Sequence, residues 1–91
     1  MDHQIAQDCL AQEMGLLKRS SYAELSRLIG RPRSKFVAGS DDKQYQIETQ
    51  VFWDDETKGN IRVLLAADCE GLSAVLPLTD SFIMSPEGIL L

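Results

Sequence analysis

The sequence contains few of the residues from which catalytic and metal sites are usually built. His3 is its one histidine, and its two cysteines, Cys9 and Cys69, do not form a Cys-x-x-Cys pair. These three residues are too few for a zinc site, which takes about four nitrogen or sulfur ligands. No Gly-x-Ser-x-Gly motif and no glycine-rich phosphate-binding motif occurs either. We therefore predict that the protein is not an enzyme and has no catalytic residues, no bound metal and no cofactor.

Long apolar runs are also missing. No stretch approaches the roughly 20 apolar residues that cross a bilayer, and the first four residues lack the basic and apolar regions of a secretory signal. The sequence thus predicts a cytoplasmic protein with no membrane association. In that compartment Cys9 and Cys69 stay reduced, and Cys9 is expected to be buried as a small hydrophobic residue.

Basic residues are outnumbered by acidic ones. Nine lysines and arginines stand against fourteen aspartates and glutamates, a net charge of −5, so the chain as a whole is repelled by phosphate backbones and anionic lipids. The bases are nevertheless concentrated between residues 18 and 35, where Glu24 is the one acid. This segment has a net charge of +5 and the remainder −10. Its bases are Lys18, Arg19, Arg27, Arg31, Arg33 and Lys35. They form either an ordinary solvated surface or a patch for an acidic partner.

Two helices are predicted in the first third of the sequence. In residues 2–18 apolar side chains recur at helical spacing, and Asp2 is placed to cap the first amides. In residues 21–29, Ser21 and Glu24 have the spacing of a capping box, and Gly30 occupies the left-handed position expected after a helix. The apolar positions are Ala6, Leu10, Met14 and Leu17 in the first helix and Tyr22, Leu25, Leu28 and Ile29 in the second. Residues 31–43 are predicted to form a loop.

The apolar period changes from 3.6 to 2 after residue 43. Residues 44–53 alternate apolar and polar side chains and predict a strand with one solvated face. Residues 61–68 predict a second strand, whose other face carries Arg62, Leu64 and Ala66 and which is therefore apolar on both faces near its end. The consecutive acids between them lack the spacing of a calcium loop and indicate a solvated turn. A short strand at 74–76 and a tight hairpin built from 81–84, a turn at 85–88 and 89–91 are expected to follow.

The order of these elements predicts an α+β fold. With 91 residues, 44% hydrophobic and 25% charged, the sequence has the size and composition of one domain, spanning residues 1–91. Helices that precede strands favour two layers. We expect two N-terminal helices packed on one face of a three- to four-stranded antiparallel β-meander.

Two segments resemble known families. Residues 21–32, SYAELSRLIGRP, followed by Val37, Ala38 and Gly39, resemble the helix-turn region of the alkylguanine-DNA alkyltransferases. The activity of that family depends on a Pro-Cys-His-Arg segment that this sequence does not contain. Residues 77–88, PLTDSFIMSPEG, resemble the C-terminal segments of small uncharacterised bacterial α+β proteins. That second resemblance implies a bacterial α+β protein and no particular activity.

The sequence favours a binding role over a catalytic one. We predict a non-catalytic protein-interaction or self-association module whose partner is a second copy or another protein. Phe52, Leu64 and Ala66 are the apolar residues expected at its surface, although aromatic residues such as Phe52 and Trp53 can equally fill a core. The alternative is nucleic-acid binding, in which the basic segment contacts phosphates through Arg27, Arg31, Arg33 and Lys35. The net charge argues against this alternative.

Overall fold

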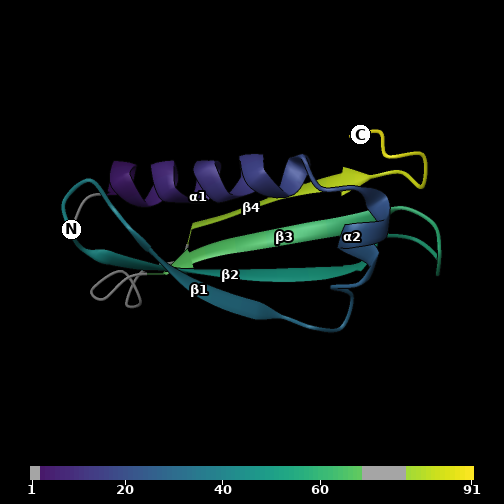
Figure 1. The fold of residues 1–91 in the computed structure, drawn as a ribbon, viewed down its shortest axis with the longest axis horizontal. Coiled ribbons are helices and arrows are strands. Elements are labelled where there is room, and N and C mark those ends of the chain that lie inside the picture. The colour runs from purple at the N-terminus through teal and green to yellow at the C-terminus, as the bar shows by residue number, and fades with distance from the viewer. Residues whose placement is uncertain (1–2, 69–77) are drawn as a thin grey trace.

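A computed structural model describes residues 3–68 and 78–91, which form an α+β fold with a four-stranded antiparallel sheet (Figure 1). Three predictions concern residues outside this described part: the cap at Asp2, the state of Cys69 and the short strand at 74–76. No helix among the described residues is long and apolar enough to span a bilayer.

Helix α1 (His3–Lys18) is the amphipathic helix that the sequence predicts. Its helically spaced apolar residues face the sheet and are at most 6% exposed, whereas its outer surface carries polar side chains and Leu16. Burying a leucine or methionine side chain contributes about 1.5–3 kcal/mol, so this stripe fixes the helix on the sheet. The stripe consists of Ala6, Cys9, Leu10, Met14 and Leu17, which confirms the expected burial of Cys9.

Helix α2 (Tyr22–Ser26) is shorter than the predicted helix at 21–29. Its capping box is confirmed: Glu24 N donates to Ser21 Oγ (3.1 Å), and Ser21 N donates to Glu24 Oε1 (2.9 Å). The expected C-terminal half of the helix is wrong, because residues 27–30 turn toward the sheet instead. Gly30 adopts the predicted positive φ (75°) and its N–H donates to Val51 O (3.4 Å). The α-helix therefore covers only five residues, at one end of the sheet (Figure 1).

The sheet is a meander in which each strand pairs antiparallel with the next in sequence. Its strands are β1 (Arg33–Ala38), β2 (Gln44–Trp53), β3 (Ile61–Asp68) and β4 (Leu78–Met84), in the spatial order β1-β2-β3-β4. The strands predicted at 44–53 and 61–68 are confirmed, as is their antiparallel pairing, which places Val51 opposite Val63. The strand-like run at 81–84 is the second half of β4.

Strand β1 corrects the prediction of a loop at residues 31–43. It pairs with β2 from Arg33, opposite Thr49, to Ala38, opposite Gln44. The sequence does not reveal this strand because it lies at the sheet edge, where five of its six residues are exposed and no apolar alternation is required. The following turn is tight: a Cβ on Gly39 would lie 2.6 Å from a ring carbon of Tyr45.

The hydrophobic core lies between α1 and one face of the sheet. Alternate residues of each strand point to that face, as the pleat requires. Leu25 of α2 and nine residues of β2, β3 and β4 join the α1 stripe there: Tyr45, Ile47, Val51, Ile61, Val63, Leu65, Ala67, Phe82 and Met84. After β4, the predicted turn at 85–88 is present, with a positive φ at Gly88 and a bond from Ser85 N to Ile89 O (2.8 Å).

Candidate functional site

No described element covers the sheet face that points away from α1. We call this surface the open face. Strand alternation and the pairing register assign its side chains. They are Ser34, Phe36 and Ala38 of β1; Gln44, Gln46, Glu48, Gln50 and Phe52 of β2; Arg62, Leu64 and Ala66 of β3; and Thr79, Ser81 and Ile83 of β4.

Apolar side chains lie on β3 and at two separate borders of the open face, because Phe36 is opposite Gln46 and Phe52 is opposite Arg62. On β3, Leu64 and Ala66 are half-buried, whereas Leu65 between them belongs to the core, which confirms that this strand is apolar on both sides near its end. At the edges of the face, Phe36 is 66% and Phe52 38% exposed. Exposed aromatic side chains on a sheet that has one uncovered face are typical of a contact surface.

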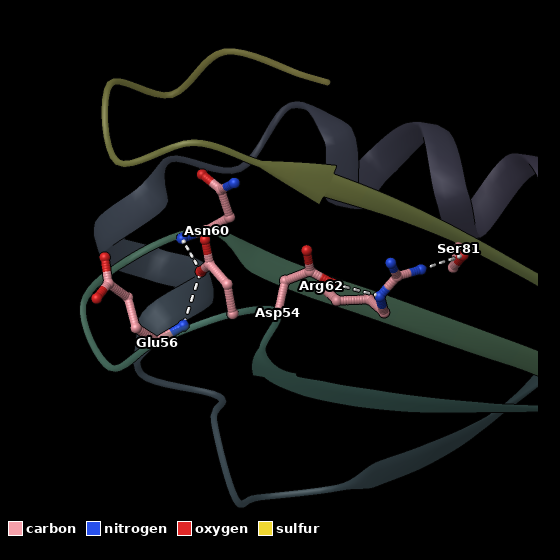
Figure 2. A network of polar contacts seen from close by, with 6 residues as sticks. Asp54, Glu56, Asn60, Arg62 and Ser81 are labelled. Carbon is pink, nitrogen blue, oxygen red and sulfur yellow. Dashed lines mark hydrogen bonds and ion pairs between the residues drawn. The ribbon is translucent and has the colours of Figure 1, made fainter.

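Arg62 lies on the open face near the turn between β2 and β3, between Phe52 and Ile83, its neighbours across the strands. Figure 2 shows its guanidinium held from two sides: Nε donates to Asp54 Oδ1 (2.8 Å) and Nη1 to Ser81 Oγ (3.5 Å). The charge of Arg62 is thus balanced within the chain. Among the described side chains assigned to this face, Glu48 is then the one charge without an ion-pair partner.

The acidic turn between β2 and β3 is organised by its own backbone, as expected of a solvated hairpin tip. Asp55 Oδ1 accepts hydrogen bonds from Glu56 N (2.7 Å) and Asn60 N (3.1 Å) (Figure 2). Lys58 takes a positive φ (67°). Tyr22 Oη donates to Gly59 O (2.8 Å) and so ties α2 to this turn. In residues 3–68 and 78–91 no three metal-binding side chains are grouped together.

The four predicted basic residues do not lie on the open face. Arg27 follows α2, and Arg31 lies in the connection to β1; both are exposed. Arg33 and Lys35 alternate with Phe36 along β1, so they point to the helix side. Lys35 Nζ is 2.8 Å from Glu13 Oε1 of α1. The structure therefore brings together Phe52, Leu64 and Ala66 and separates them from the cations.

The chain that precedes β1 diverges from the last residues of β2 (Figure 1), and a groove lies between the two segments. Pairing with β1 ends at Thr49, and residues 29–32 run past 50–53 with a single bridge between Ile29 and Val51. The space between the two segments is about 440 Å³. A smaller hollow of about 190 Å³ adjoins it at Pro32 and Gln50 and is also lined by Arg33 and Glu48.

Hydrogen bonds shift the pKa of two carboxyl groups, both in structural roles. At Glu24 the backbone and hydroxyl of Ser21 lower the pKa by stabilising the carboxylate. At Asp41 partial burial favours the neutral acid, but hydrogen bonds from Tyr45 Oη (2.8 Å) and Lys43 N (3.2 Å) outweigh it and the pKa is lowered. Neither group lies at the open face.

Reasoning from the sequence does not reveal three features of the structure: Phe36, the groove and the burial of Glu13. Phe36 has no signal in the sequence because the pattern of residues 31–43 predicts a loop. The groove was missed because it depends on where β1 leaves β2. The burial of Glu13, which is 5% exposed, could have been predicted. Glu13 lies within the apolar stripe of α1, between Leu10 and Met14, where a buried acid needs a partner.

Comparisons of the chain with protein-family models, with curated proteins and with solved structures find no match.

Proposed function

We propose that the protein is a non-catalytic interaction module that associates with a second copy of itself through the open face. The observation that carries this proposal is the exposure of Phe36 and Phe52 on a sheet face whose central strand presents Leu64 and Ala66. Leu64 and Ala66 do not belong to the core, because the core residues of β3 lie on the opposite side of the strand.

The size of the face supports a second copy as the occupant. Four strands at their usual spacing are about 19 Å wide, and the eight residues of β3 extend about 27 Å. The flat area of this face is about 500 Å², and its protruding side chains increase the accessible surface. The total approaches the surface that each partner buries in a standard interface, which is about 800 Å². Closed two-fold pairs are the commonest arrangement of identical chains.

The charge of the face supports self-association as well. A surface that meets a copy of itself must avoid like charges. The guanidinium of Arg62 is paired with Asp54 inside the same chain, so its contribution to repulsion between copies is small. The strongly basic residues 31, 33 and 35 lie elsewhere.

Measuring the molar mass at high micromolar concentration tests the proposal, with two leucine-to-glutamate variants compared. Leu64→Glu places a charge in the open face and should give a folded monomer. Leu16→Glu is the matched control, because Leu16 is 50% exposed on the outer surface of α1, and it should remain dimeric. A parent protein that is monomeric at these concentrations, or a Leu64→Glu dimer, would contradict the proposal. Binding of RNA or DNA at low ionic strength would instead favour the nucleic-acid alternative.

A further inference from the structure

The groove between residues 29–32 and 50–53 is mainly apolar. Ile29, Val51, Phe52 and Trp53 provide its apolar walls, and Arg31 and Gln50 its polar side chains. A space of about 440 Å³ lies in the range of about 300–1,000 Å³ that is usual for ligand sites. It is therefore large enough for apolar side chains of a partner.

The charges beside the groove favour an acidic occupant. Its lining residues include Arg31 and no acid. The adjoining hollow adds Arg33 and one acid, Glu48, so the combined lining has a net charge of +1. The Arg31 guanidinium can therefore attract a carboxylate to the groove.

The backbone at the groove favours an extended occupant. Val51 O points to this side, because it accepts from Gly30 N at 3.4 Å. Since peptide groups alternate in direction along a strand, the backbone of Trp53 points to the same side, beyond the last residue that β1 pairs. A segment lying beside Trp53 in an extended conformation therefore meets peptide groups as well as apolar walls.

We propose that this groove binds an extended segment of a partner protein in which apolar side chains alternate with carboxylates. The apolar side chains contact Ile29 and Trp53, and a carboxylate binds Arg31. The groove shares Gln50 and Phe52 with the open face, whereas Leu64 does not line it, so Leu64→Glu allows the two proposals to be tested separately.

Trp53 supplies the measurement, since it is the one tryptophan of the chain and lines the groove. The probe is a blocked five-residue peptide of alternating aspartate and leucine, titrated against the Leu64→Glu variant so that self-association does not contribute. The acidic peptide should change the Trp53 emission with a saturable curve. A peptide with lysine in place of aspartate is the matched control and should give no such curve.

Charge reversal at the groove separates a specific site from general adhesion. Arg31→Glu should weaken the acidic peptide about tenfold or more, because a charge-assisted contact is replaced by repulsion. Arg19→Glu makes the same change at an exposed arginine that does not line the groove, and its affinity should equal that of the parent. The proposal is overturned if neither peptide binds, if the lysine peptide binds equally well, if Arg31→Glu binds like Arg19→Glu, or if a single-stranded RNA produces the response instead.

Discussion

Glu13 of α1 and Lys35 of β1 join the helix layer to the edge of the sheet through an ion pair of 2.8 Å. The two ends of this pair differ in environment: the side chain of Glu13 is 7% exposed and that of Lys35 is 53% exposed. Glu13, Lys35 and Arg33 line a small cavity of about 150 Å³. The pair therefore holds a buried carboxylate with a cation that reaches in from solvent, and it fixes β1 against α1.

Removing the two partners of this pair should have unequal effects. Lys35→Met leaves the Glu13 carboxylate buried without its cation and should destabilise the fold by about 1–3 kcal/mol, less than for a fully buried pair because Arg33 is nearby. Glu13→Gln leaves Lys35 free to be solvated and should cost less. Urea unfolding at neutral pH measures both, and equal shifts of the midpoint would contradict this interpretation.

Leu25 should be the most sensitive position of α2. Leu25 is the one fully buried residue of this short helix. Leu25→Ala therefore removes the side chain through which α2 joins the core. The expected loss is about 2–5 kcal/mol in the free energy of unfolding. Leu28→Ala is the control, since Leu28 is only half-buried and should cost less. An unchanged urea midpoint for Leu25→Ala would show that α2 does not stabilise the core.

Asp41 should make the turn between β1 and β2 sensitive to acid. Because its pKa is lowered in the folded protein, its charged form stabilises the fold above the ordinary pKa of an aspartate, and this contribution is lost as the pH falls through the lowered value. Asp41→Asn should therefore lower Tm at neutral pH and have a smaller effect at strongly acidic pH.

The hydroxyl of Tyr45 provides a check on that cause, because it donates to Asp41 Oδ2. Tyr45→Phe should reduce the pH dependence of the Asp41→Asn effect on Tm. If the difference between the parent and Asp41→Asn is the same at both pH values, the ionisation of Asp41 does not contribute to stability.

The sequence predicted the elements whose pattern is dictated by burial. In β2, Tyr45, Ile47 and Val51 alternate with polar residues because one face packs on α1. This alternation predicts both bounds of the strand. The capping box of Ser21 and Glu24 was readable for a different reason: its two hydrogen bonds are local and depend on spacing alone.

What the sequence did not predict depends on contacts between distant residues. Strand β1 has Arg33 and Lys35 on its inner side, where a core strand would have apolar residues, and Lys35 is accommodated there by Glu13, twenty-two residues earlier. The early end of α2 has the same kind of origin, since the pairing of Ile29 with Val51 competes with continued helix. Phe36 lies on the open face because β1 is a strand, which the sequence does not predict.

The order of the meander has a consequence for synthesis on the ribosome. Strands that pair with their neighbours in sequence need only short loops to close, and hairpins of this kind form in about 1–10 μs. Helix α1 is different: it is made first, but the strands it contacts include β3 and β4, which are made last. Its apolar stripe therefore has no complete sheet to cover until β4 has left the ribosome. During that interval the nascent chain exposes Leu10, Met14 and Leu17, and a chaperone that recognises short apolar helices would find its target there.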